Sequence, residues 1–571
     1  MNENIVKSKE NRRKIYISLL VTVICLVGLT YALFTIFLKQ TENNSLATRT
    51  CFSTSLTEET SKITLDKAYP LTHEKGLETT PFTFKLTNNC DKPVKVYITI
   101  DSTYRTSTSS SYLSDSYIRE NINLKGETTA PSVILTEQTL KEIDNGNQGY
   151  LIKETWLEAN EEKEYDLRLW MDENVTVEQG LNKTWKGSVV VSAVAETKLP
   201  TWDNPEDGTL LAAIKRDNTV TTPKTTPGSE ISSDTEAVLA STEDDYGTSY
   251  YFRGAVTNNF VEYANMCWRI VRITGDGSIK MVLYNYNGLT STNNTPSSST
   301  PCNVTGNDYA FARYKGGTYQ STFSLGLVDN ASVGFMYGTA GDSSYAETHA
   351  NTNASTILTN LNKWYTNVLS KQANFSDSQL ADTIWCNDKS VVTDATFNPY
   401  GLILGTNYGY AKNLNYYSAD KRLLQASSLD VVGGTGPSLI CPNDNKGGKL
   451  SKFTVSDTEY GNGALSGYAK VGLLTVDEIA FAGGTSGDIN TTYYIKGNVN
   501  SSWWWSLSPE SFYGGDNSAY VWCVDGSAAF LAEDYVYDYM DVRPSLSLQS
   551  GVKISTSGNG SATNPYKVVM E

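Results

Sequence analysis

Aromatic and acidic side chains are concentrated in the stretch 503–548. They are the residue types of this chain best suited to binding a ligand. Tyr and Trp give large, rigid contact areas at low rotamer cost, which favours a binding surface, although the same rings could form a β-rich core. The predicted ligand contacts are seven aromatic residues with four acidic partners: Trp504, Tyr513, Tyr520, Trp522, Tyr535, Tyr537 and Tyr539, with Asp516, Asp525, Asp534 and Asp538.

Alternation within this stretch predicts which side chains share a face. In 519–524, a strand would turn Tyr520 and Trp522 to the same side. The three tyrosines of 535–539 would likewise share a face, opposite the valine between them. The Asp525-Gly526 pair predicts a turn that folds the first run onto the next.

Catalytic and metal-binding patterns are weak in the rest of the sequence. His73 and His349 are the only histidines, and neither belongs to a recognisable nucleophile motif. The absence of a C-x-x-C pair argues against zinc or thioredoxin-like chemistry. Carboxylates could hold calcium, but no loop has recognisable ligand spacing. We therefore predict no cofactor, with calcium as the open alternative.

Composition narrows the class of protein. A chain of 571 residues is expected to form two or three domains. Its net charge of -16 disfavours nucleic acid as a partner. Abundant Ser, Thr, Asn, Gly and Tyr are typical of β-rich extracellular proteins.

A membrane anchor is predicted at the N-terminus. Basic residues in 1–14 precede an apolar run at 15–38, which as a helix would extend roughly 36 Å, enough to cross a hydrocarbon core of about 30 Å. The charge bias places 1–14 in the cytoplasm and the bulk of the chain outside. A cleaved signal peptide, with small residues at 45–47, is the competing interpretation.

The cysteines fit an exported protein. Seven of them follow the apolar run, and an odd number leaves one thiol over. The sequence does not fix the connectivity, because four cysteines already allow three pairings. The expected bridges join near neighbours and leave Cys523 unpaired: Cys51–Cys90, Cys267–Cys302 and Cys386–Cys441.

Residues 51–198 are predicted to form a β-sandwich. Strand patterns occur at 81–87, 94–100, 165–170 and 185–195. The segments 79–100 and 161–173 resemble the small β-sandwich ectodomains of camelysin-like and biofilm-fibre proteins of bacterial surfaces. The Pro-punctuated segment 199–244 is predicted to be a linker.

Residues 245–571 are predicted to form a large second domain. The run 264–273 and the run 279–283 read as strands joined by a Gly-Asp-Gly turn. The segment 355–369 has helical periodicity after a Ser355 cap, and 473–479 leads into a short helix.

These elements, with the WSLSP run at 505–509 and the DVRPSL run at 541–546, resemble the C-type lectin-like superfamily, in the branch of the formylglycine-generating enzyme. Within the second run, Arg543 is expected to donate hydrogen bonds to neighbouring carbonyls or a carboxylate. The enzymes of that branch use a closely spaced pair of copper-binding cysteines, whereas Cys523 stands alone. The resemblance therefore implies binding without chemistry.

The same superfamily includes the variable proteins of diversity-generating retroelements. Their binding residues change at the adenines of Asn codons, which yields Tyr, Asp, Ser, Ala, Gly, Leu, Phe or Cys but never Trp, Glu or Met. The segment 520–541 is rich in the permitted types, while Trp522, Glu533 and Met540 need another origin. Ordinary drift on a ligand surface is the alternative.

The sequence thus predicts a mainly β protein with an α+β head: a cytoplasmic tip, one transmembrane helix, a β-sandwich stalk, a linker and a C-type lectin-like domain. The expected function is cell-surface binding of a protein or glycan, as an adhesin or receptor. The alternatives are a structural fibre subunit and a formylglycine-generating-like enzyme that depends on a reactive Cys523.

Overall fold

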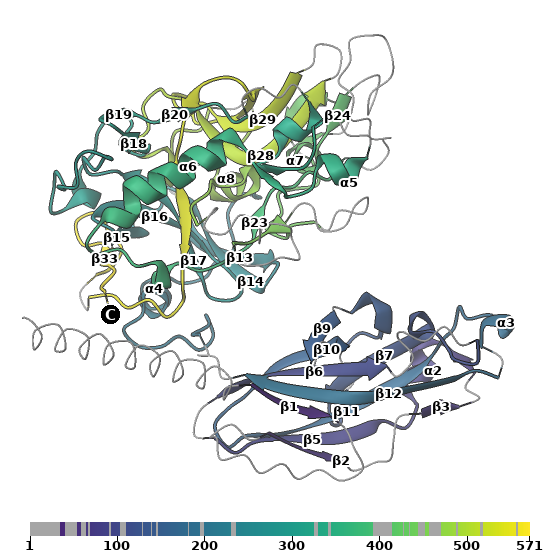
Figure 1. Ribbon diagram of the computed structural model, residues 1–571. Coiled ribbons are helices and arrows are strands. Elements are labelled where there is room, and N and C mark those ends of the chain that lie inside the picture. Colours follow the sequence, from purple (N-terminus) through teal and green to yellow (C-terminus); the bar gives the residue numbers. More distant parts are fainter. Residues whose placement is uncertain are drawn as a thin grey trace, which may run out of the picture. The chain divides into compact units, whose positions relative to one another are not determined.

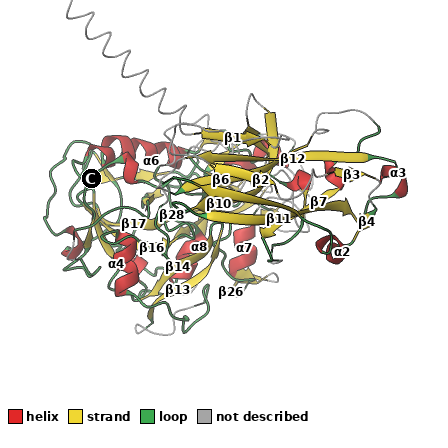
Figure 2. Ribbon diagram, turned by 90° about the horizontal axis from the view of Figure 1, so that it is seen from below, coloured by secondary structure: helices red, strands yellow, loops and turns green. Residues whose placement is uncertain are grey.

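The computed structural model divides the chain into two compact units, Met1–Lys198 and Leu199–Glu571 (Figure 1). Strands predominate in the described parts of the chain (Figure 2). The described residues are 35–39, 54–58, 64–66, 69–90, 93–102, 110–127, 130–138, 140–143, 147–180, 182–194, 199–229, 236–324, 329–340, 344–391, 414–425, 428–432, 434–442, 452–455, 470–486, 489–513, 518–555 and 558–570.

The first unit contains two six-stranded sheets. One has the order β1-β12-β6-β10-β9, with β3 beside β12, and the other has the order β2-β5-β11-β7-β8, with β4 beside β11. Two short helices, α2 (His73–Leu77) and α3 (Val177–Gly180), accompany them. The strands are β1 (Thr35–Lys39), β2 (Thr54–Glu58), β3 (Thr64–Asp66), β4 (Pro70–Leu71), β5 (Phe82–Asn88), β6 (Val94–Ser102), β7 (Ile118–Leu124), β8 (Val133–Ile134), β9 (Leu140–Ile143), β10 (Asn147–Leu157), β11 (Glu162–Asp172) and β12 (Thr184–Val194).

One hydrophobic core joins the two sheets of this unit. Phe84 and Leu86 of β5 and Ile98 of β6 are fully buried in it. Alternation in β5 and β12 sends every second side chain into this core, as expected for strands covered on one face. The four strands predicted for this domain are confirmed as β5, β6, β11 and β12.

The predicted transmembrane helix lies mostly outside the described residues, as does the alternative cleavage site at 45–47. Its last four residues, Thr35–Leu38, instead belong to β1, where Ile36 pairs with Ala193 of β12. This part of the helix prediction is wrong, because a short apolar run with β-branched residues also suits the edge of a sheet. Among the described residues, no helix has the length and apolar character needed to span a membrane.

The second unit is built around a seven-stranded and a six-stranded sheet. The first has the order β13-β14-β16-β15-β33, with β17 beside β16 and β32 beside β17. The second has the order β20-β31-β28-β29-β30, with β24 beside β28. Their strands are β13 (Ala237–Asp244), β14 (Gly247–Gly254), β15 (Phe260–Tyr263), β16 (Met266–Ile273), β17 (Ile279–Asn285), β20 (Gln320–Ser321), β24 (Leu414–Tyr416), β28 (Trp504–Tyr513), β29 (Ser518–Val524), β30 (Leu531–Tyr535), β31 (Met540–Asp541), β32 (Ser545–Leu548) and β33 (Tyr566–Lys567).

Helices and short two-stranded pairs accompany these sheets, and α6 crosses the face of the unit in Figure 1. The helices are α4 (Leu210–Asp217), α5 (Tyr345–Thr348), α6 (Thr356–Asn367), α7 (Ser418–Leu423) and α8 (Val476–Ala482). The two-stranded pairs are β18 (Arg313–Tyr314) with β19 (Gly317–Thr318), β21 (Met336–Tyr337) with β22 (Asn353–Ala354), β23 (Trp385–Cys386) with β27 (Lys452–Phe453), and β25 (Leu424–Gln425) with β26 (Ser428–Val432).

Several predicted elements of this unit are confirmed. Ser355 caps α6 by accepting a hydrogen bond from the Leu358 amide. Thr475 and Glu478 form a capping box at the start of α8. The Gly-Asp-Gly turn joins β16 to β17, and Gly277 adopts the positive φ of 88° that a glycine tolerates.

Residues 199–244 are not a linker. Leu210, Leu211 and Ile214 of α4 are buried in the core of the second unit, and Trp202 stacks on Tyr250 with 4.2 Å between ring centroids. Strand β13 pairs with β14 along its whole length. The prediction was wrong because proline and polar residues also mark turns within a folded unit, and the few apolar residues between them suffice for a buried helix.

Two of the predicted disulfides are present, Cys267–Cys302 and Cys386–Cys441. Cys51 lies outside the described residues, so its predicted bridge to the buried Cys90 stays a prediction. Cys523 is a free, buried cysteine, as expected for the odd thiol.

Candidate functional site

The aromatic stretch divides between the core and the surface. Trp504 and Trp522 are each 1% exposed, so the prediction that they form an open contact face is wrong for both. Trp504 lies beside the buried guanidinium of Arg543, 5.1 Å from the ring centroid. The indole of Trp522 donates a hydrogen bond to Asp420 of α7. Both rings are covered because helices and loops distant in sequence pack over the strands that carry them.

Asp525 has a structural role in the described structure. It is 8% exposed, and its carboxylate accepts hydrogen bonds from the amides of Ser527 and Ala528 at 2.6 and 2.7 Å. Burial opposes ionisation, but these hydrogen bonds prevail and lower its pKa. The turn predicted at 525–526 is confirmed, whereas the exposed ligand contact predicted for this carboxylate is not what the structure shows.

Tyr520, Tyr535 and Tyr537 form a tyrosine stack at the partly exposed end of β29 and β30. The Tyr520 and Tyr535 ring centroids are 4.6 Å apart, and those of Tyr535 and Tyr537 are 5.0 Å apart with 15° between planes. Tyr537 is 45% exposed. Aromatic pairs at this spacing present a rigid, flat surface. The structure thus brings three predicted residues together.

The alternation predicted for 535–539 ends after the first tyrosine. Strand β30 stops at Tyr535, and the Asp538 amide donates to the Tyr535 carbonyl to close a turn. Val536 is buried, and the turn takes Tyr539 to the wall of a neighbouring hollow. Tyr539 is 66% exposed there.

Two predicted contact residues cannot be placed. Asp516 lies outside the described residues. Tyr513 is the last residue of β28, where its backbone pairs with Ser518 and Leu414, but its side chain lies outside the described part of the structure.

An open hollow of about 540 Å³, the acidic hollow, lies beside β30 and β31. Its volume is in the range of small-molecule and side-chain binding sites. No Lys or Arg belongs to its nine described lining residues. These are Gln320, Ser501, Ser502, Trp503, Asp534, Asp538, Tyr539, Met540 and Asp541.

Asp541 is the buried acid of this hollow. It is 1% exposed, and its backbone is fixed between Gln320 and Trp504 in the sheet. Its two carboxylate oxygens have almost no accessible surface, and among the described residues neither meets strict hydrogen-bond geometry. Burial and the charge of Asp308 raise the pKa of Asp541, and the nearby polar groups of Ser502 and Gln320 and the charge of Arg313 lower it only in part.

The polar neighbours of Asp541 are engaged elsewhere. The hydroxyl of Ser502 donates to Asp308 at 3.3 Å. The guanidinium of Arg313 donates to the carbonyls of Asp308 and Ala312 and lies over the ring of Tyr286. A buried carboxylate without a donor is costly, typically by about 1–3 kcal/mol or more.

Asp534 and Asp538 add further negative charge at the rim. Burial raises the pKa of Asp534 to about 6, and the nearby carboxylates of Asp538 and Glu533 act in the same direction, against a hydrogen bond from the Tyr535 amide. Two carboxyl groups this close repel each other when both are ionised. A cation between them would relieve that repulsion.

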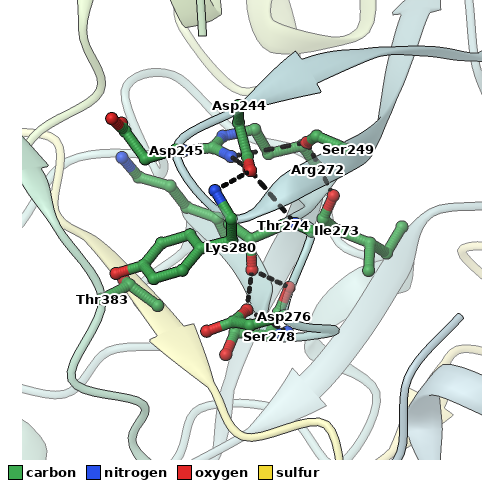
Figure 3. A network of polar contacts seen from close by, with 12 residues as sticks. Asp244, Asp245, Ser249, Arg272, Ile273, Thr274, Asp276, Ser278, Lys280 and Thr383 are labelled. Atoms are coloured by element: carbon green, nitrogen blue, oxygen red, sulfur yellow. Dashed lines mark hydrogen bonds and ion pairs between the residues drawn. The ribbon is translucent and has the colours of Figure 1, made fainter. Parts of the chain in front are cut away.

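A second polar cluster, around Arg272, is buried inside the unit (Figure 3). Arg272 pairs with Asp244 at 2.6 Å and Glu478 at 2.9 Å, and Lys280 pairs with Glu478 at 2.8 Å. The enclosed cavity beside them has about 20 Å³, room for a single water molecule. Because each charge in this cluster is paired, it stabilises the junction of β13, β16, β17 and α8 and leaves little space for a ligand.

The other groups considered for chemistry, Cys523, His349 and Arg543, are all buried. Cys523 is fully buried, and burial together with nearby carboxylates raises the pKa of its thiol, which keeps it protonated. His349 is buried between Tyr345 and Tyr417. Arg543 donates to the carbonyls of Leu283 and Ile495, as predicted. Among the described residues, no group of three His, Cys, Asp or Glu side chains is placed to hold a metal ion.

The sequence pattern missed the acidic hollow. Asp541 belongs to the DVRPSL run, which indicated a framework role, and Gln320 lies far away in sequence. The signal available was the density of acids in 533–541, but the pattern does not show which of them is buried.

Comparison with known proteins leaves the chain without a family assignment: no protein-family model matches it, and no curated protein does.

Proposed function

We propose that this protein binds a ligand at the cell surface, as an adhesin or receptor, through the tyrosine stack and the acidic hollow of its second unit. An N-terminal membrane anchor, a β-sandwich stalk and a C-type lectin-like head belong to the same proposal. The basic cluster before the apolar run and the two disulfides support an exported chain.

One observation carries the proposal. Partly exposed tyrosines are held in contact at the end of a sheet, directly beside an open acidic hollow that shares β30 with them. Tyrosines of a hydrophobic core would be buried, and tyrosines scattered over the surface would not stack on one another. Rigid aromatic rings next to polar groups are the usual make-up of binding hot spots.

The test uses the full chain in detergent, labelled and applied to arrays of glycans and of extracellular proteins. Replacing Tyr535 and Tyr537 by Ala should weaken the binding of any ligand found by about tenfold or more, as for hot-spot residues. Tyr69→Ala is the matched control, because Tyr69 is 80% exposed but belongs to the first unit. Unchanged affinity in the double variant, or an equal loss in the control, would contradict the proposal.

A further inference from the structure

We infer that Lys389 and Asn351 form an intramolecular isopeptide bond, a covalent amide between the lysine amine and the asparagine side chain. This inference goes beyond the proposed function, because it concerns a modification of the chain itself and involves neither the tyrosine stack nor the acidic hollow. It starts from one contact, in which the Nζ atom of Lys389 lies 2.7 Å from the Oδ1 atom of Asn351. Both side chains are buried, at 0% and 2% exposure.

The two reacting atoms are close enough for a bond to form between them. The carbonyl carbon of an amide lies about 1.2 Å from its oxygen, so at ordinary hydrogen-bond angles the amine nitrogen is about 3.5 Å from the Cγ atom of Asn351. Reacting atoms held at about this separation in a fixed orientation have an effective concentration of about 10⁵ M or more. Proximity of this kind can replace a catalyst in a reaction that occurs only once per chain.

Neighbouring groups fix the orientation of both partners. The Nδ2 atom of Asn351 donates a hydrogen bond to the carbonyl of Lys452 in β27 at 2.8 Å, which leaves its Oδ1 atom facing the amine. The amine of Lys389 also donates to the carbonyls of Met336 and His349. Because Lys389 follows β23 and Asn351 precedes β22, the contact joins two separate two-stranded pairs.

The buried setting suits amide formation. Removal from water disfavours a charged ammonium relative to the neutral amine, which is the nucleophilic form. The three acceptors around the nitrogen are uncharged carbonyl oxygens. Exclusion of water also protects the product, because hydrolysis of the new amide would need a water molecule at the same carbon.

The reaction is balanced with the two side chains alone. The Nζ atom of Lys389 attacks the Cγ atom of Asn351 and forms a tetrahedral intermediate. A proton passes from Nζ to Nδ2, the bond between Cγ and Nδ2 breaks, and ammonia leaves. Where the amine starts as an ammonium, its additional proton leaves with the ammonia as an ammonium ion. One carbon–nitrogen bond replaces another, so the step needs no oxidant, reductant or further reactant.

Intact-mass spectrometry of the full chain, denatured and reduced, tests the inference. Loss of ammonia should make the wild-type protein about 17 Da lighter than the mass of its sequence. A tryptic digest should contain a branched peptide that joins the segments around Asn351 and Lys389, which locates the bond. A wild-type mass equal to that of the sequence would mean that Lys389 ties the neighbouring segments together by hydrogen bonds only. The inference then fails, and the proposed function stands.

Lys389→Arg is the decisive variant, because arginine keeps the positive charge and the hydrogen-bond donors but stays protonated and cannot attack the amide. Its mass should equal that of its own sequence. Lys363→Arg is the matched control, at an exposed lysine of α6, and should keep the deficit of about 17 Da. A deficit that remains in Lys389→Arg, or that disappears in the control as well, would overturn the inference.

A second variant, Asn351→Ser, guards against a folding defect in Lys389→Arg. It removes the carbonyl carbon that the amine attacks, so the branched peptide and the mass deficit should both disappear. A branched peptide at Lys389 that persists in Asn351→Ser would assign the bond to a different partner and contradict the inference.

Discussion

The indole nitrogen of Trp522 donates a hydrogen bond to the carboxyl oxygen of Asp420 at 3.0 Å, which ties β29 to α7. Both residues are buried, so this contact belongs to the core and not to a ligand surface.

Trp522→Phe should therefore destabilise the second unit and leave the tyrosine stack in place. Loss of the larger ring and of the donor for Asp420 should cost about 3 kcal/mol in the free energy of unfolding. Urea unfolding followed by tryptophan fluorescence measures this. A variant as stable as the wild type but unable to bind ligand would show that Trp522 is a contact residue after all.

Asp420 also faces a second buried acid, Glu510, and this pair predicts a pH dependence of stability. Burial raises the pKa of Glu510 to about 7 and that of Asp420 well above its ordinary value. The folded state thus binds more protons than the unfolded state. Stability should fall as pH rises from about 4.5 to about 7, by up to about 3 kcal/mol from Glu510, and the raised pKa of Asp420 adds to the decline.

The comparison with Glu510→Gln isolates this effect. Other groups titrate in the same range, but they do so in both proteins. Thermal unfolding across the pH range should show a shallower decline for the variant. An identical decline in both proteins would mean that Glu510 does not carry the dependence.

Local patterns in the sequence were reliable where they concern hydrogen bonding between near neighbours. The Ser355 cap, the short helix predicted at 473–479 and the turn at Asp525 depend on side-chain and backbone groups within three residues of one another. The strands of the first unit were predictable because the alternation of apolar and polar residues lies within the sequence of each strand.

Sequence patterns gave wrong predictions where an element distant in the sequence determines whether a side chain is buried. Tyr520 and Trp522 were assigned to one face of a strand, yet α7 covers Trp522 while Tyr520 stays half-buried. Alternation shows which side chains share a face but not what packs on it. The acidic hollow likewise joins residue 320 to residues 501–503, 534 and 538–541, an assembly that no local pattern encodes.

The Cys386–Cys441 bridge should contribute strongly to the stability of the second unit. It closes a loop with a sequence separation of 55, which in the chain-entropy model corresponds to about 4 kcal/mol. Cys386→Ser with Cys441→Ser should lower the urea midpoint accordingly.

Alkylation of the native wild-type protein should leave the buried Cys523 unlabelled, and rapid labelling there would contradict its burial.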